Sequence, residues 1–192
     1  MFSFRADIFE FDLQNDETFL YLFKAEWRKQ FLDLSSHNYG GFTNLLKTES
    51  GKVINTGNYH FRNNHLEKLD QQMCDRFNTF AESHFINILP QCEVGEHHDI
   101  YDPQDDTVNV VNGDFINTSI LFPIFGEIEV ESNGHTRLLT NNVFTVIDTS
   151  KLHNGWNTSN SLSYCCSTLV YGKTYKDIKQ ILKDFIVEDL DD

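Results

Sequence analysis

Two imidazoles and three carboxylates crowd one short segment of this chain, residues 95–102, which reads GEHHDIYD. Within it, His97 and Asp99 stand two residues apart. On an extended backbone, side chains at positions i and i+2 leave the same face, so this imidazole and this carboxylate would point into the same space. Such a pair offers one nitrogen and one oxygen ligand to a transition-metal ion.

A third ligand has to come from a distant part of the chain. The best candidate is His153, in the segment 148–156 (DTSKLHNGW), because it opens the last strand-like region. Two imidazoles and one carboxylate on one side of a metal leave the opposite coordination positions open, as in the facial triad of non-haem Fe(II) oxygenases. His97, Asp99 and His153 therefore predict a metal centre, with Fe(II) as the expected ion.

Other interpretations of the same segment stay open at this point. A histidine and an acid two residues apart are common, and a solvated loop would contain them equally well. If Glu96 and His98 faced the site instead, the register would shift by one residue and the predicted pair would be lost. Asp102 could orient a ligand histidine. Tyr101 and Trp156 could line a pocket, although core packing is the simpler role for Trp156.

Short apolar or alternating runs, separated by turn residues, fill the chain from about residue 85 to 172. Asn-Gly pairs at 112–113 and 133–134, together with Asn141-Asn142, are typical of tight turns between strands. The runs are Phe85–Leu89, Phe115–Phe122, Glu127–Glu131, Thr136–Leu139, Val143–Ile147 and Leu162–Tyr171. Many short strands joined by tight turns predict a jelly roll or a small barrel.

Helical patterns flank this β region. Apolar residues recur at helical spacing over 16–34, 64–80 and 174–190, with Asn64 as the expected N-cap of the second helix. The remaining predictions are a strand over 2–12, a loop over 35–50 and a frayed acidic end over 188–192.

The predicted fold class is thus α+β with a mostly β core, a double-stranded β-helix (jelly roll) backed by N-terminal and C-terminal helices. No linker or internal repeat divides the chain, so we expect a single domain. Its expected parts are an N-terminal strand and backing helices over 1–84, the jelly-roll core over 85–172 and a C-terminal helix over 173–192.

The segment 95–171 resembles the double-stranded β-helix of the Fe(II)/2-oxoglutarate-dependent oxygenases, and among them the aspartyl/asparaginyl hydroxylase-like group. The matching stretches are, in order, 97–99 (HHD), 117–123 (NTSILFP), 126–135 (GEIEVESNGH) and 142–157 (NVFTVIDTSKLHNGWN). The resemblance implies that His97, Asp99 and His153 bind the iron. It also implies 2-oxoglutarate as cosubstrate, and hydroxylation of a protein side chain or a small amino-acid-like molecule.

The chain departs from this family at the cosubstrate anchor. In the family, a basic residue on the last barrel strand binds the distal carboxylate of 2-oxoglutarate. The corresponding strand here, 161–168, contains neither Arg nor Lys. Arg137 on a neighbouring strand is the candidate substitute, as are Lys151 and Lys173, while Ser163 and Tyr164 could supply only neutral hydrogen bonds.

Two other function classes remain as alternatives. One is a catalytically inactive or 2-oxoglutarate-independent jelly-roll protein, similar to a cupin, that binds a metal or another ligand. The other is a hydrolase built on the same acids and imidazoles, which is less favoured because no Ser nucleophile lies in a recognisable motif.

Composition narrows the possible partners and location. The 192 residues are 40% hydrophobic, enough for a core, and carry a net charge of −14. So acidic a surface repels polyanions, which argues against nucleic acid as a partner. No run of about 20 apolar residues and no signal-peptide pattern is present, so no membrane association is expected. Cys74, Cys92, Cys165 and Cys166 form no CxxC motif and predict free thiols in the cytoplasm. The oligomeric state stays open.

Overall fold

The computed structural model describes residues 1–9, 44–47, 53–56, 58–61, 66–99, 110–111 and 114–190. Its helices are a short 3-10 turn, η1 (Ala6–Ile8), and the α-helices α2 (Glu67–Phe77) and α3 (Tyr175–Leu182). Its strands are β1 (Phe2–Arg5), β2 (Asn44–Lys47), β3 (Val53–Thr56), β4 (Asn58–Phe61), β5 (Ala81–Ile88), β6 (Val110–Val111), β7 (Asp114–Phe125), β8 (Glu129–Ser132), β9 (His135–Leu138), β10 (Val143–Asp148), β11 (His153–Trp156), β12 (Ser163–Tyr171) and β13 (Ile186–Asp189).

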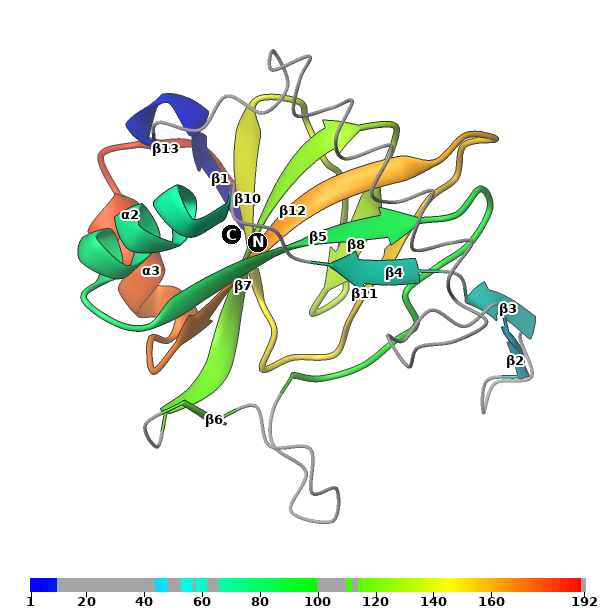
Figure 1. Cartoon of the computed structure of the whole chain (residues 1–192), viewed down its shortest axis with the longest axis horizontal. Coiled ribbons are helices and arrows are strands. Elements are labelled where there is room, and N and C mark those ends of the chain that lie inside the picture. The colour runs from blue at the N-terminus through cyan, green and yellow to red at the C-terminus, as the bar shows by residue number, and fades with distance from the viewer. Residues whose placement is uncertain are drawn as a thin grey trace.

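Two antiparallel sheets form the centre of the molecule (Figure 1). The larger has the strand order β13-β1-β10-β7-β12-β5-β4, with β6 paired to β7, and the smaller has the order β11-β8-β9. Strands that are neighbours in space, such as β10 and β7 or β12 and β5, are far apart in sequence. This arrangement confirms the predicted fold class, a mostly β jelly roll with helices on its outside.

Strand alternation divides the side chains of the larger sheet between two hydrophobic clusters. Neighbouring Cys165 and Cys166 illustrate the division, because Cys165 belongs to the cluster between the sheets and Cys166 to the cluster on the helix side. The helix-side cluster also contains Phe85, Ile120, Phe122, Phe144, Val146 and Val170. The cluster between the sheets contains Ile88, Leu121 and Ile147 of the larger sheet and Val130 of the smaller one. All four cysteines are free thiols, as predicted.

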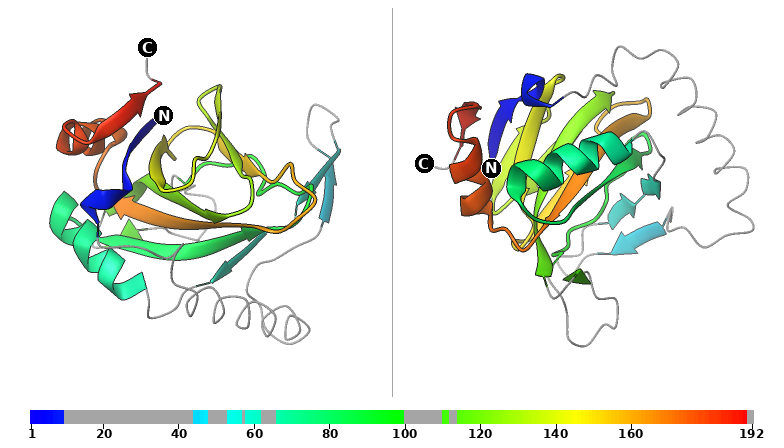
Figure 2. Two further views of the ribbon diagram at one scale, coloured as in Figure 1. Left: turned by 90° about the horizontal axis from the view of Figure 1, so that it is seen from above. Right: turned by 60° about the vertical axis from the view of Figure 1, so that its left-hand side comes forward.

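The helices α2 and α3 cover the side of the larger sheet that faces away from the smaller one (Figure 2). Apolar residues at helical spacing explain the packing of both, since Leu69, Met73 and Phe77 of α2 and Ile178 and Leu182 of α3 are buried. A capping box begins α3, because the Thr174 hydroxyl accepts from the Asp177 backbone N–H while the Asp177 carboxylate accepts from the Thr174 backbone. The Thr174 hydroxyl and the Thr174 backbone N–H both donate to the Asp177 carboxylate, and these hydrogen bonds lower the pKa of Asp177.

Both ends of the chain differ from the sequence prediction. The predicted C-terminal helix is wrong beyond Leu182, since the chain turns at 183–185 and continues as β13, which pairs with β1. An unpaired strand edge offers a row of backbone donors and acceptors, and this pairing satisfies them for β1. At the other end, β1 stops at Arg5 and gives way to η1, where a strand to residue 12 was predicted.

Two further differences concern the first third of the chain. β2 lies within the segment 35–50 that was predicted to be a loop. The predicted helix over 16–34, the cap residue Asn64 and the predicted turn at 112–113 lie outside the described residues. Among the helices that are described, none is long and apolar enough to cross a bilayer.

Gly126, which follows β7, holds a backbone conformation that a side chain would disturb. Its φ is +82°, and an added Cβ would lie 2.7 Å from the Leu162 carbonyl oxygen and 2.8 Å from the Ser163 Cα. We expect Gly126→Ala to lower the free energy of unfolding by at least about 2 kcal/mol, because positive φ and steric overlap act together. Gly134→Ala is the matched control, because its φ is +79° but nothing lies within 4 Å of an added Cβ. Equal urea midpoints for the two variants would contradict this expectation.

Candidate metal centre

A short antiparallel pairing brings the HxD segment against the start of β11. His97 and His153 form a bridge in which each backbone N–H donates to the other residue's carbonyl oxygen, both at 3.0 Å. The Asp99 N–H donates to the Thr149 carbonyl oxygen, also at 3.0 Å. Residues directly opposite in such a pair project from the same face, and position i+2 shares that face. Both imidazoles and the Asp99 carboxylate therefore emerge on one side.

The three side chains meet closely. One ligand atom from each of His97, Asp99 and His153 lies within 4.8 Å of the other two. The Asp99 Oδ1 is 3.5 Å from the His97 Nε2 and 3.9 Å from the His153 Nε2. Two ligands at about 2 Å from one ion span up to about 4 Å, so one ion fits these two distances. The structure thus brings together the residues that the sequence singled out, while their binding of a metal stays a prediction.

Hydrogen bonds to the backbone set which ring nitrogen of each histidine is free to bind. The His97 Nδ1 is 2.7 Å from the Gly95 carbonyl oxygen, and the His153 Nδ1 is 2.9 Å from the Lys151 carbonyl oxygen. A carbonyl oxygen can only accept, so each Nδ1 carries the hydrogen and each neutral ring keeps its lone pair on Nε2. Those two lone pairs face the Asp99 carboxylate. Two imidazole nitrogens and one carboxylate oxygen together form a donor set that suits a divalent transition metal.

Burial differs strongly among the three groups. The side chain of His153 is 8% exposed, that of Asp99 17% and that of His97 43%. Burial is the main cause that lowers the pKa of His153, and the nearby His97 lowers it further. A lowered pKa keeps this imidazole neutral, which is the form that binds metals. The centre therefore has one buried and one solvent-facing imidazole.

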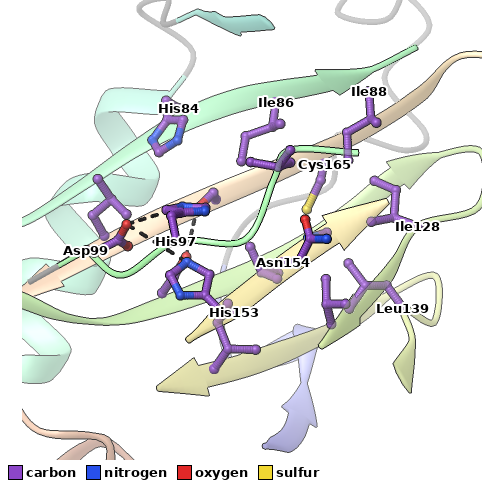
Figure 3. Close-up of a pocket in the computed structure, with 18 residues that line it drawn as sticks. His84, Ile86, Ile88, His97, Asp99, Ile128, Leu139, His153, Asn154 and Cys165 are labelled. Carbon is purple, nitrogen blue, oxygen red and sulfur yellow. Dashed lines mark hydrogen bonds and ion pairs between the residues drawn. The ribbon is translucent and has the colours of Figure 1, made fainter. Parts of the chain in front are cut away.

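A cavity of about 200 Å³ opens beside the centre, between the two sheets (Figure 3). The larger sheet contributes its β5, β7, β10 and β12 strands to the walls, and the smaller sheet contributes β8 and β11. The apolar lining residues are Ile86, Ile88, Val94, Leu121, Ile128, Val130, Leu139, Ile147 and Leu169. The cavity thus coincides with part of the cluster between the sheets, and the triad lies at one end of it.

Polar groups in the cavity are few, and several of them are already bonded within the protein. Asn154 donates from Nδ2 to Glu93 and accepts at Oδ1 from the Gly95 and Gly155 N–H groups, which ties the segment before His97 to β11. The hydroxyls of Ser119 and Ser167 are 2.8 Å apart. His84 on β5 also lines the cavity.

The lining contains one thiol, that of Cys165. Burial raises the pKa of Cys165 to about 12, so its thiol stays protonated. No Lys or Arg stands among the lining residues in the part of the chain that is described.

The structure does not bring the suggested cosubstrate anchors to the cavity. Arg137 on β9 forms an ion pair with Glu188 of β13, and its side chain is 9% exposed. Its Nη1 is buried and has no hydrogen-bond partner within the described residues. Lys151 is exposed and Lys173 is half-buried, and neither lines the cavity.

The remaining residues that the sequence suggested lie elsewhere. Glu96 and His98 are exposed, so the shifted register is not the one observed. The Ser163 hydroxyl donates to the Glu127 carbonyl oxygen, and Tyr164 packs in the helix-side cluster. The Trp156 Nε1 donates to Glu129 at 2.7 Å. Tyr101 and Asp102 lie outside the described residues.

Sequence reasoning missed the cavity walls and the role of Asn154. Alternation along the strand-like runs could have grouped Ile86 with Ile88, since such residues share a face. It could not have shown which of the two faces meets the smaller sheet. The hydrogen bonds of Asn154 left no signal in the sequence, because its partner Glu93 lies on another segment.

No protein-family model matches the sequence, and no curated protein matches it. Among solved structures, the chain is similar to a Cupin_2 domain of an XRE family transcriptional regulator from Enterobacter cloacae, with 17% identity over 48% of this chain and 83% of that one, at a TM-score of 0.38. It is also similar to a predicted oxalate decarboxylase from Thermotoga maritima, with 15% identity, coverage of 60% and 79%, and a TM-score of 0.39. A DMSP lyase from Ruegeria pomeroyi matches with 12% identity, coverage of 47% and 38%, and a TM-score of 0.34. At these values nothing about function passes from those proteins to this chain.

Proposed function

We propose that this chain is a mononuclear metal-dependent enzyme that acts on a small, mainly apolar molecule without 2-oxoglutarate. The observation that carries the proposal is the convergence of two imidazole Nε2 atoms and one carboxylate at the end of an apolar cavity. His97, Asp99 and His153 would hold the ion. A bound divalent metal would supply Lewis acidity and open positions for oxygen ligands.

Other groups of the chain orient the imidazoles, support the segment before His97 and exclude water. The backbone carbonyls of Gly95 and Lys151 orient the two imidazoles through their Nδ1 hydrogens. Asn154 holds the segment before His97 in place. The apolar walls exclude water from the bound molecule, which strengthens every electrostatic contact at the metal end.

Metal titration of the full chain tests the proposal. With Mn(II) as a spin probe and with anaerobic Fe(II), we expect one equivalent to bind, and a chelator to remove it. The donor set of two imidazoles and one carboxylate predicts Fe(II), Mn(II) or a neighbouring transition metal rather than Mg²⁺ or Ca²⁺. Absence of binding at micromolar protein, with a fold intact by circular dichroism, would refute the proposed function.

A second candidate is an Fe(II)- and 2-oxoglutarate-dependent hydroxylase of a protein side chain or a small amino-acid-like molecule. The make-up of the triad, two histidines and one aspartate with open positions, favours it. Such an enzyme splits 2-oxoglutarate into succinate and CO₂ while one atom of O₂ enters the substrate C–H bond. Formation of succinate by the Fe(II)-loaded chain would favour this candidate over the first.

A further inference from the structure

We infer that the ligand of this centre is a small carboxylate with an aliphatic tail, best represented by an aliphatic 2-oxo acid, rather than a dicarboxylate. The inference rests on the proposed function and names the substrate class of the same site. In the proposed binding mode, the oxygen atoms of the ligand's 2-oxo acid head group lie at the triad end of the cavity. The aliphatic tail extends into the cavity between the sheets.

The two ends of the cavity differ in chemistry. His97, Asp99 and His153 lie at one end, and Ile88, Ile128 and Leu139 lie at the other (Figure 3). Ile88 ends β5 of the larger sheet, whereas Ile128 precedes β8 and Leu139 follows β9 of the smaller sheet, and all three are at most 6% exposed. A ligand that reaches inward from the triad therefore meets aliphatic carbon on both sides. An aliphatic tail gains from leaving water there, because burial of apolar surface is favourable.

Among the described residues that line the cavity, a second carboxylate at the far end would find no Lys or Arg as a partner of opposite charge. A buried ion needs a counter-charge or several hydrogen bonds. Cys165 lies near that end (Figure 3), and its thiol keeps its proton because burial raises its pKa. Asn154 uses its amide groups for Glu93, Gly95 and Gly155. His84, which can carry a positive charge, lies away from Leu139, toward the triad end.

The size of the cavity limits the ligand. The cavity's volume is about 200 Å³. Pockets for drug-sized ligands begin at roughly 300 Å³. The ligand is therefore a short-chain molecule whose tail fills the space once it reaches Ile88 and Leu139, so affinity should depend on tail length.

Calorimetric titration of the Mn(II)-loaded chain tests the inference. The probes are unbranched 2-oxo acids that start at pyruvate, together with 2-oxoglutarate and its analogue in which an isopropyl group replaces the distal carboxylate. We expect affinity to rise about fourfold for each added methylene until the cavity is full. We expect the isopropyl analogue to bind at least about tenfold more tightly than 2-oxoglutarate.

A pair of neighbouring leucines provides matched variants. Leu139 lines the cavity and is 6% exposed, whereas Leu138 is 50% exposed and lies outside it. Leu139→Ala should shift the optimum tail length upward by about one or two carbon atoms, since the removed methyl groups leave room. Leu138→Ala should leave the optimum unchanged. Both variants should bind Mn(II) as the native chain does.

The outcomes separate this inference from the proposed function. Affinity that is independent of tail length, or 2-oxoglutarate that binds as tightly as its isopropyl analogue or more tightly, would overturn the inference while the metal site stands. A native chain that binds no Mn(II) would overturn both. An optimum that moves equally in the Leu138 and Leu139 variants would also contradict the placement of the tail.

Discussion

Replacement of Asp99 by alanine is expected to abolish measurable metal binding. Asp99 supplies the negatively charged ligand of the triad, and its Oδ1 lies within 4 Å of both histidine Nε2 atoms. Loss of residues that merely orient metal ligands typically weakens binding 10- to 100-fold, so loss of a ligand should exceed about 100-fold. Titration with Mn(II), followed by electron paramagnetic resonance, measures the effect directly.

His98→Ala is the matched control for this experiment. His98 neighbours both ligands in sequence but is exposed, and its Nδ1 lies 3.4 Å from the Ser150 carbonyl oxygen. We expect its metal affinity to equal that of the native chain. Asp99→Asn adds a second test, because it keeps the shape of the side chain and removes the charge. Native-like affinity in Asp99→Ala would remove this residue from the metal site.

Phe144→Ala should destabilise the protein more than Gly126→Ala does. Phe144 on β10 is 1% exposed and stacks on Phe4 at 5.0 Å between ring centroids, with Phe9 at 5.4 Å and Phe122 at 4.6 Å. Truncation of a buried phenylalanine to alanine costs about 3–5 kcal/mol, a large share of the roughly 5–15 kcal/mol that stabilises a typical domain. Urea unfolding measures the change.

Phe125→Ala serves as the control for Phe144→Ala. Phe125 ends β7 and is 49% exposed, so its removal should change the free energy of unfolding by less than about 1 kcal/mol. The comparison also tests the position of β1, because Phe4 and Phe144 are direct partners in the β1–β10 register. A small loss of stability in Phe144→Ala would show that the N-terminal strand does not pack on β10 in solution.

The metal centre depends on both local backbone geometry and long-range strand pairing. The local level is the spacing of His97 and Asp99, which depends on two residues of extended backbone. The long-range level is the pairing of residues 93–99 with residues 149–156. This pairing depends on the register of β8 with β11, in which Val130 lies opposite Gly155 and Glu129 lies opposite Trp156. The site therefore depends on the pairing of β8 with β11 as well as on the local spacing.

Much of the fold could be read from short-range patterns. Alternation and turn residues indicated β5, β7, β8, β9, β10 and β12, and Asn133-Gly134 does form the predicted turn, with φ of 53° and 79°. Such patterns work because they depend on neighbouring φ and ψ angles. Where a competing long-range interaction exists, they fail. The segment 186–189 lies within the predicted helix 174–190, yet it forms β13, which pairs with the edge of β1.

By itself, the sequence determined that His97 and Asp99 share a face, that many short strands make a mostly β fold, and that the four cysteines need not pair. Only the tertiary structure decided that His153 stands directly opposite His97, that Arg137 pairs with Glu188, and that one face of the larger sheet lines an apolar cavity. The physical reason is the separation along the chain of the residues that interact. A strand's two faces follow from its local geometry, but what each face meets is chosen by the pairing of segments far apart in the chain.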